Sequence, residues 1–143
     1  MQSQYNLLYR EDEREMNRFC NDTGVGLIPW APLCRGHLAR PPSQFGLTTR
    51  SEQEKKDPGS ELGEPDLTVI QRVIEIGGKR DWPMAHVALA WINKRVTSPI
   101  IGCSSVGRLE QAIAAKGKRL SDEEDKYLEE PYLPKAVFIA ESL

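Results

Sequence analysis

The chain has 143 residues and a mass of 16.1 kDa, which fits one domain of ordinary size. Its 39% hydrophobic and 28% charged residues are typical of a globular protein and exclude a collagen-like, disordered or membrane-spanning chain. Its 19 basic and 21 acidic residues leave a net charge of −2 and a pI near 5.8. This balance argues against nucleic-acid and anionic-membrane partners, because both are bound by basic surfaces.

The first part of the chain alternates short apolar runs with one helical pattern. Residues 5–8 and 25–28 are apolar runs that predict two strands. Residues 10–21 between them predict a helix, which Gly24 ends as a left-handed cap. The inner face of this helix is expected to carry apolar side chains at helical spacing: Met16, Phe19 and Cys20.

The second part predicts two helices, a third strand and two more helices. Asp66 begins a helix that Gly77-Gly78 ends, and a second helix begins near Pro83. Residues 97–101 predict the strand, and residues 106–115 the helix after it. The expected inner face of that helix is Leu109, Ala112 and Ile113. The last helix begins with a capping box between Ser121 and Glu124 and runs through Leu128.

Strands separated by helices run parallel through crossover connections, so this order predicts an α/β fold with about three parallel strands and flanking helices. Three parallel strands leave two open edges, which makes the sheet incomplete and available for pairing with another chain. Residues 35–64 form a long stretch without pattern. A cofactor-covering loop and a mobile insertion explain it equally well.

The cysteines and histidines offer little chemistry. Cys20, Cys34 and Cys103 are odd in number and form no C-x-x-C pair, so neither a disulfide framework nor a zinc site is predicted. His86 lies among core positions of a helix and is expected to be structural, whereas His37 follows a strand and is more open to a ligand role. The first residues lack a signal-peptide pattern, which favours a cytoplasmic location.

Two segments carry the functional hypothesis. Residues 28–36, IPWAPLCRG, run from a strand into a proline-stiffened turn, at the end where parallel α/β folds place their sites. A rigid turn with Trp30 as a core residue is the alternative. Residues 100–109, IIGCSSVGRL, end a strand in small hydroxyl residues and begin a helix, so free backbone N–H groups and Arg108 could bind a phosphate. A serine-capped helix with a solvated arginine is the alternative there.

Together these segments resemble the aldo-keto reductases, specifically the aryl-alcohol dehydrogenase-like and versiconal-reductase-like branch related to the potassium-channel β subunits. Residues 2–11, QSQYNLLYRE, resemble the sixth barrel strand and its exit, residues 24–36 the seventh, and residues 98–109 the eighth with its phosphate-binding helix. The resemblance implies that residues 1–143 are the C-terminal part of a (β/α)8 TIM barrel that is incomplete in this chain. It also implies an NADP-linked reductase of aldehydes or ketones.

The resemblance assigns cofactor roles position by position. Gln2 matches the residue that hydrogen-bonds the nicotinamide carboxamide. The turn that holds the nicotinamide ribose and pyrophosphate is matched by Trp30, Ala31, Pro32, Leu33, Cys34 and Gly36. The site of the adenosine 2′-phosphate is matched by Gly102, Ser104 and Arg108. Gln111 and Ala112 stand where the branch commonly has Glu and Asn, which predicts weaker adenine contacts, and Arg50 in the long loop is expected to approach the phosphates.

No residue of the chain matches the family's catalytic Asp, Tyr, Lys and His, which come from earlier barrel strands. Three hypotheses follow. The first is a truncated oxidoreductase without activity alone, since the general acid is missing. The second is a non-catalytic nucleotide-binding or interaction module that pairs with a partner chain or with itself through its open edges. The third, least favoured, is a standalone enzyme using Cys34, His37 or a tyrosine. A small carbonyl compound is the expected substrate of a completed barrel; its identity stays open.

Overall fold

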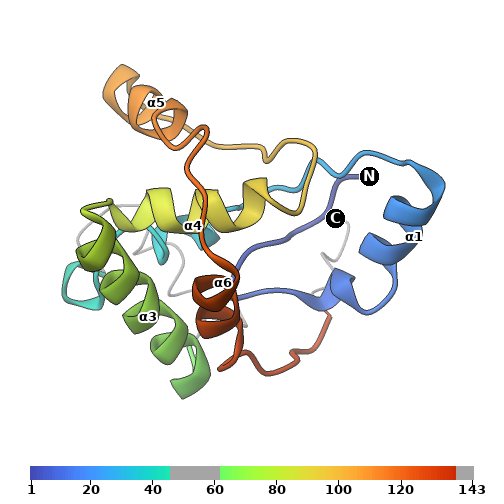
Figure 1. Ribbon diagram of the computed structural model, residues 1–143, viewed down its shortest axis with the longest axis horizontal. Coiled ribbons are helices and arrows are strands. Elements are labelled where there is room, and N and C mark those ends of the chain that lie inside the picture. Colours follow the sequence, from blue (N-terminus) through green and yellow to red (C-terminus); the bar gives the residue numbers. More distant parts are fainter. Residues whose placement is uncertain (46–61, 138–143) are drawn as a thin grey trace, which may run out of the picture.

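A computed structural model describes residues 1–45 and 62–137 of the chain (Figure 1). Its helical elements, in chain order, are the 3-10 turn η1 (Glu11–Glu13), α1 (Met16–Thr23), the 3-10 turns η2 (Cys34–Gly36) and η3 (Pro42–Gln44), α3 (Glu64–Arg80), α4 (Met84–Asn93), α5 (Val106–Ile113) and α6 (Asp122–Glu129). Each predicted helix corresponds to one of these elements, although several boundaries differ.

Three extended segments, around residues 4, 30 and 100, lie side by side and run parallel. Trp30 forms a parallel bridge with Gln4 on one side and with Ile100 on the other. Backbone hydrogen bonds continue this pairing, with Trp30 N donating to Ser3 O at 2.8 Å and Ile100 N to Pro29 O at 2.8 Å. Within the described residues the pairing appears as isolated bridges and not as full strands. Ile100 lies in its predicted strand, whereas Gln4 and Trp30 lie just outside the predicted strands at residues 5–8 and 25–28.

The predicted strand at residues 5–8 is wrong, because this segment turns back on itself. Asn6 and Tyr9 exchange two backbone hydrogen bonds of 3.1 Å, which closes a tight turn. Leu7 and Leu8 are both 1% exposed. The apolar run reflects burial of the turn in the core, and burial alone cannot distinguish a turn from a strand.

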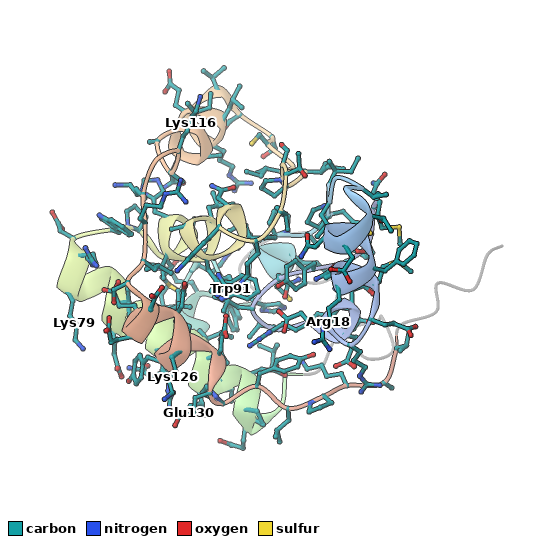
Figure 2. The ribbon with its side chains drawn as sticks, turned by 45° about the vertical axis from the view of Figure 1, so that its right-hand side comes forward. Arg18, Lys79, Trp91, Lys116, Lys126 and Glu130 are labelled. Atoms are coloured by element: carbon teal, nitrogen blue, oxygen red, sulfur yellow. The ribbon has the colours of Figure 1, made fainter. Side chains whose placement is uncertain are left out.

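The core lies where α4 packs against α3 and where α3 packs against α6. Figure 1 shows these three helices together on one side of the N-terminal segment. Residues 85–92 of α4 are all buried, so this helix is apolar around its whole circumference. Trp91 lies at the centre, fully buried, with its ring 5.3 Å from that of Tyr5 (Figure 2).

Helix α3 starts before and ends after the predicted limits. Gly63 is the N-cap, and Asp66 is the third helical residue, whose Oδ2 accepts from Gly63 N at 3.0 Å. Gly77 and Gly78 lie inside the helix, which ends at Arg80 with Asp81 in the left-handed conformation. Glycine ends a helix only where the backbone turns left-handed, and neither residue does so here.

Helices α1 and α5 expose apolar side chains that were predicted to face inward. Phe19 in α1 is 61% exposed, and Leu109 and Ile113 in α5 are 48% and 60% exposed. Figures 1 and 2 both show α5 at the periphery, beyond α4. Only Ala112, of the three predicted inner residues of α5, packs against the core. An apolar face shows which side of a helix could be covered, and not that a neighbour covers it.

The caps of α1 and α6 are confirmed. Gly24 ends α1 with φ 73°, and its N–H donates to Cys20 O. Ser121 and Glu124 form the predicted reciprocal capping box at the start of α6. Both caps depend on local chemistry alone, so the sequence predicts them correctly.

The residues after α6 contact the N-terminal part of the chain through hydrogen bonds. Tyr132 Oη donates to Glu11 Oε1 at 2.6 Å, and Lys135 N donates to the same oxygen at 2.6 Å. Lys135 Nζ also donates to Asp66 Oδ1 on α3 at 2.6 Å. Residues 130–137 therefore form a C-terminal segment that joins η1 to α3.

The long unpatterned stretch is described in part. Residues 35–45 contain η2 and η3, and Leu38 is completely buried. Residues 46–61, with Arg50, lie outside the described residues. A cofactor-covering loop thus stays a prediction.

Among residues 1–45 and 62–137, no helix is long and apolar enough to cross a bilayer.

Candidate functional site

The turn after the central extended segment has an unusual backbone. Ala31, Cys34 and Arg35 have φ values of 53°, 44° and 55°, and Gly36 has φ 109°. Left-handed conformations are costly for residues other than glycine and are frequent where a backbone is shaped for a ligand. The turn is closed by its own hydrogen bonds, with Cys34 N donating to Ala31 O and Gly36 N to Leu33 O, both at 2.9 Å.

Asn6 holds this turn in place, and the sequence analysis missed it. Its side chain is fully buried, Nδ2 donates to Ala31 O at 2.9 Å, and Oδ1 accepts from Leu8 N at 2.9 Å. One amide therefore joins the turn at residues 6–9 to the turn at residues 31–36. A polar side chain inside the apolar run of residues 5–8 was the signal available in the sequence.

The predicted nicotinamide-side residues lie together beside this turn. Met1 O accepts from Ile28 N and Ser3 O from Trp30 N, so Gln2, which is exposed, lies opposite Ile28. Trp30 is half-buried at the centre of the three segments. Pro32 is buried, while Leu33 and Cys34 are half-buried against the core. The parallel pairing places the carboxyl ends of all three segments at one edge.

The predicted phosphate residues lie at the start of α5. Arg108 Nη1 donates to Ser104 Oγ at 3.0 Å, and Ser105 caps the helix by accepting from Arg108 N at 3.4 Å. Residues 102–111 are all exposed, so Gly102 and Gln111 are accessible as well. A guanidinium, a hydroxyl and the first N–H groups of a helix are thus gathered where solvent reaches them.

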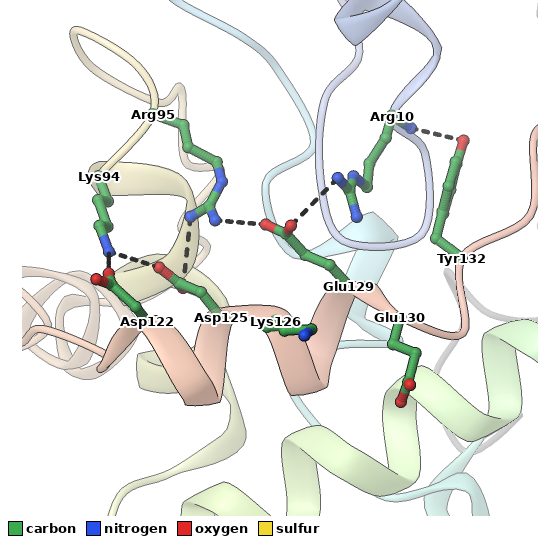
Figure 3. Close-up of a pocket in the computed structure, with 9 residues that line it drawn as sticks. All are labelled: Arg10, Lys94, Arg95, Asp122, Asp125, Lys126, Glu129, Glu130 and Tyr132. Carbon is green, nitrogen blue, oxygen red and sulfur yellow. Dashed lines mark hydrogen bonds and ion pairs between the residues drawn. The ribbon is translucent and has the colours of Figure 1, made fainter.

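A pocket of about 730 Å³ lies elsewhere, between η1, the end of α4 and α6 (Figure 3). It is lined by charged side chains and one tyrosine: Arg10, Lys94, Arg95, Asp122, Asp125, Lys126, Glu129, Glu130 and Tyr132. None of the described residues predicted to bind the cofactor lines it.

The charges of this pocket are largely satisfied by one another. Lys94 Nζ lies 2.7 Å from Asp122 Oδ1 and 2.8 Å from Asp125 Oδ2, and hydrogen bonds to these carboxylates raise the pKa of Lys94. Arg95 pairs with Glu129, which also accepts from Trp91 Nε1 at 2.9 Å. The pocket is therefore largely an ion-pair cluster that joins η1, α4 and α6.

Among the described residues, the histidines and cysteines do not form a reactive cluster. His86 is 7% exposed, and its Nε2 is bonded to the backbone oxygen of Gln111. His37 stacks edge-on against Phe45 with ring centroids 4.7 Å apart. None of the three cysteines, all of which lie in the described residues, forms a disulfide. No group of three metal-ligating side chains occurs within the described parts of the chain.

Comparison with known proteins decides the family. The model of the aldo/keto reductase family matches residues 1–132, which is most of the chain and includes both candidate segments. The chain belongs to the aldo/keto reductase family. This confirms the family resemblance seen in the two segments.

Several curated fungal aldo-keto reductases are similar to the chain over nearly its whole length. An aldo-keto reductase of Fusarium vanettenii is 56% identical over 138 residues, which is 96% of this chain and 37% of the relative. A putative aryl-alcohol dehydrogenase of Schizosaccharomyces pombe is 46% identical over 134 residues, 94% of this chain and 38% of the relative. The versiconal hemiacetal acetate reductase of Aspergillus parasiticus is 42% identical over 145 residues, 96% of this chain and 41% of the relative.

Solved aldo-keto reductase barrels share the fold of the chain. A thermostable aldo-keto reductase in complex with the inhibitor epalrestat has a TM-score of 0.66 at 23% identity, over 91% of this chain and 38% of that one. The glycerol dehydrogenase of Gluconobacter oxydans has a TM-score of 0.73 at 21% identity, over 97% of this chain and 45% of that one. The chain thus has the fold of part of a barrel and spans about two-fifths of the proteins it matches.

Proposed function

We propose that the chain is the NADP-binding, C-terminal part of an oxidoreductase barrel that reduces aldehydes or ketones to alcohols. The observation that carries the proposal is the cluster at the start of α5, where Arg108 Nη1 lies 3.0 Å from Ser104 Oγ on an exposed helix N-terminus. This cluster lies inside the region matched by the aldo/keto reductase family. The family as a whole generally uses nicotinamide cofactors.

The residues at α5 fit the 2′-phosphate that distinguishes NADP from NAD. A phosphate dianion needs a fixed cation, hydroxyl donors and backbone N–H groups, and Arg108, Ser104 and the first turn of α5 supply one of each. Arg108 is already oriented by a neutral hydroxyl, so its charge is available to an anion. Gly102 leaves open space at the entrance, since a side chain there would meet nothing within 4 Å.

The turn at residues 30–36 fits the other end of the cofactor. Its left-handed residues and Gly36 shape the backbone into a turn that the buried Asn6 amide fixes. Trp30 supplies a half-buried aromatic face, and Gln2 an exposed amide with the donors and acceptor that a carboxamide requires. When bound, the dinucleotide supplies the hydride; the chain's own residues hold and orient it.

Reduction also requires a group that protonates the carbonyl oxygen, and the family supplies it from a tetrad that no residue here matches. We therefore expect binding without measurable turnover from the 143-residue chain alone. A barrel completed by the missing elements would restore activity.

The test is calorimetric titration of the full chain with NADP and with NAD. Arg108→Ala is expected to weaken NADP binding about ten- to a hundredfold, the size of a hydrogen-bonded charge contact, and to leave NAD binding unchanged. Arg18→Ala is the matched control, because Arg18 is exposed on α1, away from α5 (Figure 2). Equal NADP and NAD affinities in the wild type would contradict the proposal.

A second candidate function is an interaction module that pairs with a partner chain. One support is the exposed apolar face of α5, where Val106 is 72% and Ile113 60% exposed. The other is Ile100, which is 44% exposed in an outer segment of the three that pair. Light scattering after size exclusion tests it. This function predicts a mass above that of one chain. Ile113→Glu, at the end of α5 away from Arg108, is expected to return the protein to the monomer and to leave NADP affinity near that of the wild type.

A further inference from the structure

Helix α5 depends on few contacts for its position. None of its residues is buried, and α4 is the helix against which it packs. Its C-terminal end is anchored by Ala112 and the fully buried Ala115, while its first turn, with Arg108, is exposed. Small apolar contacts at one end only weakly determine how a helix is rotated about its axis. A single hydrogen bond to the helix therefore has a large effect on where its first turn points.

One directed contact joins α4 to α5. His86, in the first turn of α4, is 7% exposed, and its Nε2 lies 2.8 Å from the backbone oxygen of Gln111. A carbonyl oxygen only accepts, so Nε2 carries the proton and donates. In the neutral ring Nδ1 is then an acceptor, and it is buried without a hydrogen-bond partner. A buried unpaired nitrogen costs free energy that an apolar side chain would avoid, so the directed bond is what the imidazole contributes.

Gln111 follows Arg108 by three residues, about one helical turn. Fixing the carbonyl of Gln111 therefore fixes the rotation of α5 and with it the direction of the Arg108 side chain. We infer that His86 is a positioning residue for the anion site, setting through Gln111 the orientation in which Arg108 and Ser104 meet a 2′-phosphate. This inference rests on the proposed function, because it assigns a purpose to the same site.

Two variants of similar size separate the directed bond from simple packing. His86→Leu fills the space without a donor, whereas His86→Gln retains an amide donor. We expect His86→Leu to weaken NADP binding about three- to tenfold, the effect of one lost hydrogen bond, with NAD binding unchanged. His86→Gln is expected to stay within about twofold of the wild type. Equal weakening of NADP and NAD by His86→Leu, or no recovery with His86→Gln, would overturn the inference.

Hydrogen exchange provides a readout that needs no ligand. The amides of Leu109 and Ala114, which bond to Ser105 O and Glu110 O, are expected to exchange faster in His86→Leu while those of α3 keep their wild-type rates. Unchanged exchange in α5 would overturn the positioning role. If exchange is faster in His86→Leu but the wild type binds NADP and NAD equally, the proposed function is refuted. His86 would then only hold α5 in place.

Discussion

Gly77 and Gly78 are neighbours in α3 with opposite surroundings. A Cβ at Gly77 would lie 2.8 Å from the backbone oxygen of Trp82, whereas one at Gly78 would meet nothing within 4 Å. Gly77 is also buried and Gly78 exposed. The first glycine allows the chain to pass close to the helix as it turns toward α4, and the second has no such role.

Alanine at the two positions is predicted to have opposite effects. Gly77→Ala forces a backbone shift and should lower the free energy of unfolding by about 1–3 kcal/mol. Gly78→Ala should raise it by about 0.5–1 kcal/mol, because alanine loses less conformational entropy in a helix. Urea denaturation of both variants measures the difference, and equal effects would contradict the close approach of Trp82.

Asn6 is predicted to be essential to the turn at residues 31–36. Asn6→Ala removes the partner of the buried Leu8 N and one of the two donors to Ala31 O, which also accepts from Cys34 N. The expected loss in the free energy of unfolding is about 1–3 kcal/mol. Asn21→Ala, at an exposed position in α1, is the control and should change stability by less than about 0.5 kcal/mol. Similar losses for the two variants would refute the role of Asn6.

At the scale of elements, the C-terminal segment is coupled to pH through Glu11. Burial favours the neutral acid, but hydrogen bonds from Tyr132 Oη and Lys135 N, together with the charges of Arg14 and Lys135, outweigh it and lower the pKa of Glu11. A carboxyl whose pKa is lowered on folding stabilises the folded state above its unfolded pKa, about 4.3 for glutamate, and loses that contribution as pH falls through the lower folded value.

We therefore predict that Glu11→Gln lowers stability at neutral pH, and that the difference from the wild type shrinks as pH falls below about 4.3. Thermal melts between pH 7 and pH 2 measure it. A difference that stays constant with pH would show that the charge of Glu11 does not contribute.

The elements also show what a single sequence can predict. The caps at Gly24 and at Ser121 with Glu124 were predicted correctly because they depend on neighbours within four residues. The burial of Phe19, Leu109 and Ile113 was not, because it depends on elements far away in the sequence or outside the chain. In the candidate site, the sequence predicted Ser104 and Arg108 as members of one cluster. It did not predict Asn6, whose side chain bonds a residue 25 positions away.

At the scale of the whole molecule, the helices form a core around α3, α4 and α6, while the sheet is limited to single bridges. The α/β order was predictable from the alternation of apolar runs and helices. The short extent of the pairing among the described residues was not, because it depends on contacts between residues far apart in the sequence, such as Trp30 and Ile100.

We propose that this chain, with its partial barrel, binds NADP. A thermal melt of the full chain with and without NADP, with NAD as comparison, is the decisive experiment. NADP at about 100 times its Kd should raise the free energy of unfolding by about 2.7 kcal/mol and move a cooperative transition upward by several degrees. NAD at the same concentration should move it less. A transition unmoved by NADP, or moved equally by both dinucleotides, would contradict the account.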